Sequence, residues 1–269
     1  MNRDSLHQIF DPARPLLIGV CHLLPLPGSP RYAGSMDAII ERAVSDARAY
    51  LDAGMAGVLV ENFGDAPFYP DDVPKETVAA MTAVAVEVRR SAALPTGVNV
   101  LRNDAHAALA VAAAAGLPFV RINVHTGATA TDQGIIEGRA HETLRLRARI
   151  APGAKLFCDV LVKHGRPLGT DDPVLAAEEA TGRGLADAVI LTGPATGRAA
   201  DFAAVRRVRS ALPGVPALIG SGVTAESVRE ALDAAGGAIV GTSVKRDGVT
   251  EAPVDPARAR ALVLAALGR

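Results

Sequence analysis

Carboxylate and amine side chains stand at the ends of apolar runs in this sequence. Glu61 ends the run 57–61 (GVLVE), and Asp159 lies in 155–160 (KLFCDV) with Lys163 shortly after it. Burial raises the pKa of a carboxyl group towards the range useful for acid–base catalysis. A buried lysine with a lowered pKa acts as a base or forms a Schiff base. We expect Glu61 and Asp159 to be the general acid and base. For Lys163, an ion pair with Asp159 that only holds the loop is the alternative.

Two long loops carry further candidates for catalysis. His22 follows the first apolar run, where an imidazole can shuttle protons, bind a metal or simply pack. Asp132 lies in the stretch 125–139 (HTGATATDQGIIEGR), whose glycines are typical of a lid that closes over substrate. An ordinary surface turn is the alternative for Asp132. Amide and guanidinium groups near the same run ends are suited to orient a substrate or stabilise negative charge. The substrate-binding residues expected on this ground are Asn62, Asn99, Arg102 and Asn123.

Glycine-rich turns follow the last two apolar runs. IGSGVT (219–224) leads into a helical segment, and VGTSVK (240–245) follows the final run. Glycine lets a backbone approach an anion closely, and exposed N–H groups at a helix start hold phosphate. The alternative is that these glycines only make tight turns. The pattern predicts a phosphate site, to which we assign Gly193, Ser221, Gly222, Gly241 and Thr242.

Eight apolar runs alternate with eight segments of helical period. The runs lack polar alternation, which is typical of strands buried on both faces of a parallel sheet. The expected strands are 16–20, 57–61, 97–101, 118–124, 155–160, 187–191, 215–219 and 237–240. The expected helices are 36–53, 75–93, 104–115, 140–150, 173–182, 200–211, 225–235 and 256–267. Eight such units in 269 residues predict an α/β fold, a single (β/α)8 TIM barrel, with a doubly wound open sheet as the alternative.

The barrel interpretation explains where the polar residues fall. Active sites of this fold lie at the carboxyl ends of the strands, and barrels often bind phosphate after strands seven and eight. No linker or composition break is visible, so we expect one domain over residues 1–269, with residues 1–15 as an N-terminal extension.

Composition excludes several classes of protein. Lys plus Arg total 28 against 29 for Asp plus Glu, which removes the electrostatic footprint of a general nucleic-acid binder. The longest uncharged stretch, 107–120, is shorter than the ~20 residues of a membrane-spanning helix. The two cysteines are far apart and form no redox or metal motif, which predicts a cytoplasmic protein. We expect no nucleic-acid partner, no membrane insertion and a homo-oligomer packed through its alanine-rich helices.

A bound metal has little support in the sequence. Glu61, Asp159, His22 and His164 could converge at a barrel mouth, but no local spacing resembles a zinc motif. We therefore expect no cofactor and no metal, with a divalent metal as the alternative.

The sequence resembles the BtpA/SgcQ family over nearly its whole length. The motifs that carry the resemblance are HLLPLPGSP (22–30), VENFGDAPF (60–68), NVLRNDA (99–105), TDQGIIEG (131–138), DVLVKH (159–164), TGPATG (192–197), IGSGVT (219–224), VGTSVK (240–245) and PVD (253–255). The resemblance implies a barrel of the phosphate-binding group. It implies two kinds of function, because one member was described as a photosystem I assembly or stability factor and another lies among genes of sugar-phosphate metabolism.

Together, these features predict an enzyme that acts on a small phosphorylated metabolite by acid–base catalysis of isomerase, lyase or transferase type. The substrate would be a pentose phosphate or the ribose-phosphate part of a nucleotide. Aromatic residues make up only 3% of the chain, which favours a bare sugar phosphate over a purine ligand. A non-catalytic assembly factor and a nucleoside N-glycosidase are the alternatives.

Overall fold

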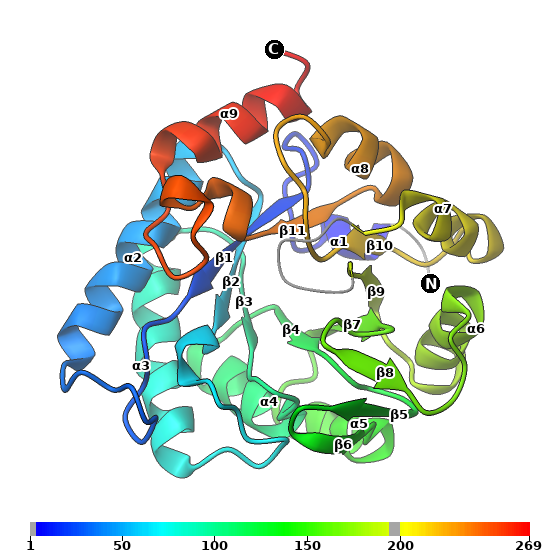
Figure 1. Cartoon of the computed structure of the whole chain (residues 1–269), viewed down its shortest axis with the longest axis horizontal. Helices are drawn as coiled ribbons and strands as arrows, with labels where there is room; N and C mark the ends of the chain where they lie inside the picture. The colour runs from blue at the N-terminus through cyan, green and yellow to red at the C-terminus, as the bar shows by residue number, and fades with distance from the viewer. Residues whose placement is uncertain (1–3, 194–199) are drawn as a thin grey trace.

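Eight parallel strands close into a barrel in the computed structural model, which describes residues 4–193 and 200–269 (Figure 1). Around the barrel the order is β1-β11-β10-β9-β7-β4-β3-β2, with β2 paired back to β1. The strands are β1 (Leu17–His22), β2 (Gly57–Glu61), β3 (Thr96–Asn99), β4 (Phe119–Ile122), β7 (Lys155–Val160), β9 (Ala188–Leu191), β10 (Ala217–Ile219) and β11 (Ala238–Val240). The predicted TIM barrel is confirmed. Most of the motif 192–197 lies outside the described residues.

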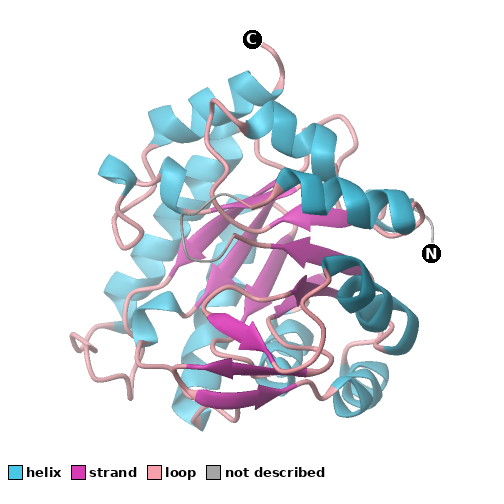
Figure 2. Ribbon diagram, turned by 45° about the vertical axis from the view of Figure 1, so that its right-hand side comes forward, coloured by secondary structure: helices cyan, strands magenta, loops and turns pink. Residues whose placement is uncertain are grey.

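Helices cover the outside of the barrel (Figure 2). They are α2 (Met36–Ala53), α3 (Lys75–Ala92), α4 (Ala105–Ala115), α5 (Ala140–Ile150), α6 (Pro173–Glu178), α7 (Phe202–Ala211), α8 (Val228–Ala235) and α9 (Pro256–Ala266). Side-chain caps set several starts, as where Asp104 accepts the N–H of Ala107. The helix expected at 225–235 begins only at Val228, because Ser227 Oγ accepts the N–H of Thr224 and holds a turn there. The expected helix 173–182 ends early in a π-helical turn, η2 (Glu179–Arg183).

A second, three-stranded antiparallel sheet lies beside the barrel mouth. Its strands are β5 (Ala128–Thr131), β6 (Gly134–Glu137) and β8 (Gly165–Pro167), in the order β6-β5-β8. The stretch 125–139, expected as a long loop that could act as a lid, therefore contains a hairpin, and the segment that follows β7 pairs with it. Asp132 lies exposed at the tip of this hairpin. Sequence reasoning missed the sheet because β5 and β8 are separated along the chain by more than thirty residues.

The N-terminal segment closes the amino end of the barrel. After the short helix α1 (Asp4–His7), the buried ring of Phe10 packs against Phe119 at 5.6 Å and Phe157 at 6.4 Å between centroids. Aliphatic side chains of the strands fill the rest of the barrel interior above these rings. Because rings and aliphatic side chains close the bottom, the polar groups of the barrel are left at its mouth. None of the described helices combines the length and the apolar character needed to span a bilayer.

Candidate active site

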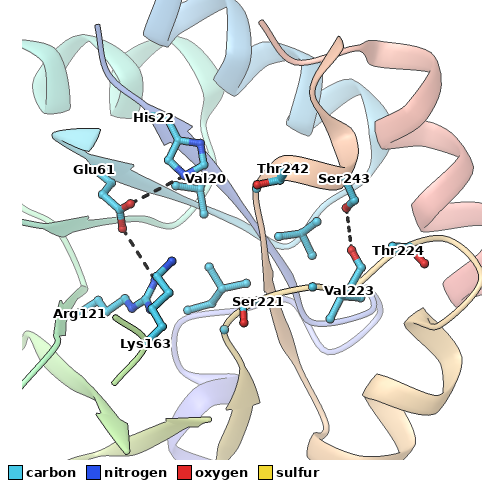
Figure 3. A pocket seen from close by; sticks show the side chains of 15 residues that line it. Val20, His22, Glu61, Arg121, Lys163, Ser221, Val223, Thr224, Thr242 and Ser243 are labelled. Atoms are coloured by element: carbon cyan, nitrogen blue, oxygen red, sulfur yellow. Dashed lines mark hydrogen bonds and ion pairs between the residues drawn. The ribbon is translucent and has the colours of Figure 1, made fainter. Parts of the chain in front are cut away.

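A pocket of about 170 Å³ opens at the carboxyl ends of the barrel strands (Figure 3). On one side lie polar side chains carried by β1, β2, β4 and the segment after β7. On the other lie the turns after β10 and β11. Its lining residues are Val20, His22, Glu61, Arg121, Lys163, Gly220, Ser221, Gly222, Val223, Thr224, Ile239, Val240, Gly241, Thr242 and Ser243.

Glu61 presents an available carboxylate to this pocket. The residue ends β2 and is only 3% exposed. Its Oε1 lies 3.7 Å from His22 Nε2, and its Oε2 lies 3.8 Å from Arg121 Nη1. Both distances exceed a hydrogen bond, and no other side chain in the described ranges donates one to Glu61. The carboxylate is thus held near two partners but keeps its oxygens available to a ligand.

Asp159 is also in the barrel, but its carboxylate is already engaged. Its Oδ1 accepts from Arg121 Nε and its Oδ2 from Arg121 Nη2, both at 3.0 Å, and Asn123 Nδ2 donates to Oδ2 at 2.8 Å. Asn99 Nδ2 donates in turn to Asn123 Oδ1 at 2.9 Å. A bidentate pair of this kind fixes the guanidinium plane. The geometry therefore favours a positioning role for Asp159 over the general-base role expected from the sequence.

Lys163 lines the pocket without an ionic partner. Among residues 4–193 and 200–269, no carboxylate lies within 4.0 Å of its Nζ, so the alternative of an Asp159–Lys163 ion pair is wrong. Arg102 Nη2 donates to the carbonyl oxygen of Lys163 and holds the backbone in place. Burial lowers the pKa of the Lys163 amine, and the neighbouring positive charge of Arg121 lowers it further.

His22 forms the wall beside Glu61. Its ring packs on Phe63 at 4.8 Å between centroids, and its Nδ1 has no hydrogen-bond partner in the described part of the protein. Burial, followed by the positive charges of Lys245 and Lys163, lowers the pKa of His22 well below its ordinary value. The imidazole is consequently neutral at physiological pH. Across the described residues, no three His, Cys, Asp or Glu side chains are placed to hold a metal ion.

The residues of the turns after β10 and β11 line the pocket. Gly222 has a φ of 70°, a left-handed conformation that glycine adopts without strain. Ser243 Oγ donates to the carbonyl of Val223 at 2.6 Å and ties the two turns together. Four N–H groups here find no acceptor within the described chain: those of Gly222, Val223, Thr242 and Ser243. Such groups at short, glycine-containing turns suit an anionic oxygen.

The structure separates the predicted residues into two sets. Those that line the pocket are His22, Glu61, Lys163, Ser221, Gly222, Gly241 and Thr242. Those outside its lining are Asn62, Asn99, Arg102, Asn123, Asp132, Asp159 and Gly193. Two residues outside the lining contact residues that line the pocket. The N–H of Gly193 donates to Ser221 Oγ at 2.7 Å, and Arg102 donates to the backbone carbonyl of Lys163.

Asn62 faces away from the pocket and organises the loop after β2. Its Oδ1 accepts the N–H of Leu101 at 2.7 Å, and its Nδ2 donates to Asp65 Oδ2 at 3.0 Å. Asp65 also accepts the N–H of Leu26 at 2.8 Å, and burial raises its pKa. Both polar atoms of the Asn62 side chain therefore bond to other groups of the protein, and Asn62 does not line the pocket.

Among the charged side chains that line the pocket, Arg121 was not in the predicted set. It lies two residues after Phe119 on β4, so both side chains point into the barrel, with Arg121 nearer the mouth. Glu61 stands in the same relation to Leu59, and Asp159 to Phe157. A charged residue two positions after an inward-facing apolar residue of the same strand is the sequence pattern that could have predicted Arg121 as a pocket residue.

The BtpA family pattern matches residues 13–267 of this chain. A Synechocystis protein, the photosystem I biogenesis protein BtpA, is 45% identical over 96% of this chain and 90% of its own length. An uncharacterised protein of Thermococcus kodakarensis is 47% identical, over 94% of this chain and 96% of its own.

Solved structures share the fold at low sequence identity. N-(5'-phosphoribosyl)anthranilate isomerase from Pyrococcus furiosus aligns over 94% of this chain and 100% of its own, with a TM-score of 0.56 and 13% identity. A native KDPGal structure aligns over 94% of this chain and 92% of its own, with a TM-score of 0.55 and 13% identity. At such identity the likeness concerns the barrel alone. Because the family pattern and close relatives cover nearly the whole sequence, the chain belongs to the BtpA family.

Proposed function

We propose that this protein is an enzyme that acts on a small phosphorylated metabolite at the barrel mouth, with Glu61 as the group that moves protons. The observation that carries the proposal is the Glu61 carboxylate, which is almost fully buried, faces the pocket and lies 3.7 Å from His22 and 3.8 Å from Arg121, beyond hydrogen-bond distance of either. Taking a charge out of water costs free energy that such long ion pairs offset only in part, so a carboxylate held in this way at a pocket wall suits a ligand better than a purely structural role. A ligand hydroxyl or carbon acid in the pocket supplies its partner.

The opposite wall suits a phosphate group. The N–H groups of Gly222, Val223, Thr242 and Ser243 can donate to phosphate oxygens, and Arg121 brings a positive charge to the same pocket. The cavity of about 170 Å³ is smaller than the ~300–1,000 Å³ of drug-sized sites. No Phe, Tyr or Trp side chain lines it within the described ranges, and the ring of His22 is already packed against Phe63, so a purine finds little surface to stack against. A pentose phosphate fits this chemistry better than a nucleotide.

The side chains around Glu61 are suited to proton transfer next to a carbonyl group. Glu61 would take a proton from the carbon beside the carbonyl and return it to a neighbouring atom, the step that isomerases and lyases share. Arg121, held by Asp159, would stabilise the oxyanion that develops. The neutral imidazole of His22 would hydrogen-bond a substrate hydroxyl. The phosphoribosyl substrate in the name of the Pyrococcus isomerase is consistent with this class of ligand.

A non-catalytic assembly role is the second candidate, because the Synechocystis relative is named for photosystem I biogenesis. An assembly role does not require an open pocket into which the Glu61 carboxylate faces. The two candidates therefore differ in whether phosphorylated ligands bind at the barrel mouth.

A thermal-shift titration with inorganic phosphate, ribose 5-phosphate and ribose tests the proposal. A ligand at 100 times its Kd stabilises the native state by about 2.7 kcal/mol, which raises the Tm of a protein of this size by roughly 5–10 °C. We expect the shift with both phosphorylated ligands and little with ribose. If no phosphorylated ligand in a wider sugar-phosphate set shifts Tm, the assembly role takes precedence.

A matched pair of variants places the phosphate. Gly222→Asp puts a carboxylate among the donating amides, whereas Gly222→Asn adds nearly the same volume without charge and tolerates the positive φ. We expect the aspartate variant to lose the phosphate-induced shift and the asparagine variant to retain part of it. Equal shifts in both variants would place the phosphate elsewhere.

A further inference from the structure

Lys163 differs from the other three lysines of the chain in its surroundings. Lys245 is fully buried, with its Nζ 2.7 Å from Asp46 Oδ2, and Lys155 Nζ lies 3.4 Å from Asp187 Oδ1. Lys75 is exposed at the start of α3. Lys163 lines the pocket, and no carboxylate in the described ranges lies within 4.0 Å of its amine. Its charge is therefore not neutralised by an ion pair, in contrast to the two other lysines that have an acidic neighbour.

The groups that face Lys163 disfavour its ammonium form. Burial acts most strongly against protonation, followed by the positive charge of Arg121; the carboxylates of Glu61 and Asp159 act for it, and Arg102 adds a smaller effect against it. The carboxylate of Asp159 is neutralised by Arg121, which reduces the support it gives to an ammonium. A larger share of neutral amine at a given pH makes Lys163 a better nucleophile.

In the pocket, the Lys163 amine lies opposite the turns after β10 and β11, which are the proposed phosphate site. In Figure 3, Lys163 reaches into the pocket beside Arg121 and Glu61, while Thr242 and Thr224 lie on the far side. A ligand whose phosphate contacts the turns after β10 and β11 would present its carbon chain to Lys163 and Glu61. Because the cavity has a volume of only about 170 Å³, the carbon chain of such a ligand can contain only a few carbons.

We propose that Lys163 is a covalent nucleophile that forms an imine with the carbonyl carbon of a short phosphorylated aldose or ketose. This inference rests on the proposed function, and it narrows the substrate to one that carries both a phosphate and a free carbonyl group. An arginine could not replace Lys163 in this role, because a guanidinium stays protonated.

The step balances without a cofactor. The amine nitrogen bonds to the carbonyl carbon while the carbonyl π electrons move to oxygen, and Glu61 relays one amine proton to that oxygen. A second proton, taken from solvent through Glu61, lets the oxygen leave as water while the nitrogen electron pair closes the C=N bond. The products are one protonated imine and one water. The protonated imine then withdraws electrons from the adjacent bonds, which aids the proton transfer assigned to Glu61.

Borohydride trapping tests the imine directly. The intact protein is incubated with ribose 5-phosphate or glyceraldehyde 3-phosphate, reduced with sodium borohydride, digested and mapped by mass spectrometry. Hydride adds to the imine carbon and leaves a stable secondary amine on the modified lysine. With only four lysines in the sequence, each site is read separately. We expect at least tenfold more adduct on Lys163 than on Lys75, its surface counterpart.

Two variants serve as controls. Lys163→Arg keeps a positive charge but has no nucleophilic amine, so the adduct should disappear while the inorganic phosphate shift in Tm persists. Lys75→Arg should leave the Lys163 adduct unchanged. If Lys163→Arg fails to fold, the amount of adduct on Lys163 can still be compared with the amount on Lys75 within the unaltered protein.

The outcomes separate this inference from the proposed function. A phosphate-induced Tm shift without adduct at Lys163 would overturn the imine and leave the phosphate site standing. Equal labelling of Lys163 and Lys75, or equal labelling by phosphate-free glyceraldehyde, would also overturn it, because the amine would then react without a site. Absence of any phosphate-induced shift would count against the proposed function itself.

Discussion

Arg121 holds Asp159 with two hydrogen bonds of 3.0 Å, yet the same guanidinium approaches Glu61 only to 3.8 Å. Each carboxylate lies two residues beyond an inward-facing apolar side chain of its strand, Leu59 or Phe157. One is neutralised and shared with Asn123, and the other keeps its oxygens available to the pocket. Two acidic groups that share one arginine thus have different surroundings, the condition that lets two carboxylates take different roles in an acid–base site.

Replacing Glu61 with glutamine should remove catalysis while preserving the fold. The amide has the same shape but cannot accept and return a proton, so kcat should fall by about 10²-fold or more on the sugar phosphate that binds. Phosphate-induced stabilisation should remain, because the turns after β10 and β11 are untouched. Glu87→Gln, on the exposed side of α3, is the matched control. Unchanged turnover in Glu61→Gln would remove this residue from the mechanism.

Asp159→Asn should destabilise the protein far more than the loss of a surface ion pair. It leaves the Arg121 guanidinium buried without its bidentate partner, which costs about 3–5 kcal/mol of unfolding free energy. Glu230→Gln removes an exposed pair with Arg206 and should cost less than about 1 kcal/mol. Urea unfolding of both variants measures the difference. Similar losses would show that the Arg121–Asp159 pair contributes no more than a surface contact.

Gly241→Ala should distort the pocket through a direct clash. An added Cβ would lie 2.6 Å from Cε1 of His22, while φ of Gly241, −125°, lies outside the left-handed region that favours glycine. We expect a loss of about 1–3 kcal/mol in stability together with weaker phosphate binding. Gly153→Ala, where an added Cβ meets no atom within 4 Å, is the neutral control.

A second substitution checks the cause of this effect. In the double variant with His22→Ala the ring is gone, so adding Gly241→Ala should cost little further stability. Additive losses in a double-mutant cycle would rule out the clash with His22 as the reason.

The buried imidazole of His22 should make stability depend on pH. Its pKa is lowered well below 6.5 in the folded protein, mainly by burial, whereas it returns to about 6.5 on unfolding. The unfolded state therefore binds more protons as pH falls below about 6.5, and the unfolding free energy decreases by up to ~1.4 kcal/mol per pH unit through this group.

His22→Asn should flatten that dependence. Between pH 7.5 and 5.5 we expect the variant to lose about 1 kcal/mol less stability than the unaltered protein, as measured by urea unfolding at each pH. His141→Asn, a substitution of an exposed residue of α5, should leave the slope unchanged. Parallel slopes for all three proteins would mean that His22 gains its proton in the folded state as readily as in the unfolded one.

The sequence by itself determined the barrel and the level at which its polar residues stand. Apolar runs without alternation marked all eight barrel strands, and the period of two along a strand sends Glu61 and Asp159 inward above Leu59 and Phe157. These features depend on neighbouring residues in the chain, so they can be predicted from local patterns. The glycine turns after β10 and β11 were predictable for the same reason.

Only the tertiary structure decided which side chains meet. Asp159 pairs with Arg121 on the adjacent strand β4 and not with Lys163, which is nearer in sequence, and Asn62 turns away to hold the loop after β2. Within the stretch expected as a lid, β5 and β6 form a hairpin, and β8 from beyond β7 pairs with β5 along its other edge. Such choices follow from the closure of the barrel, which brings together strands distant in sequence and decides by geometry which charged group is neutralised and which is left for a ligand.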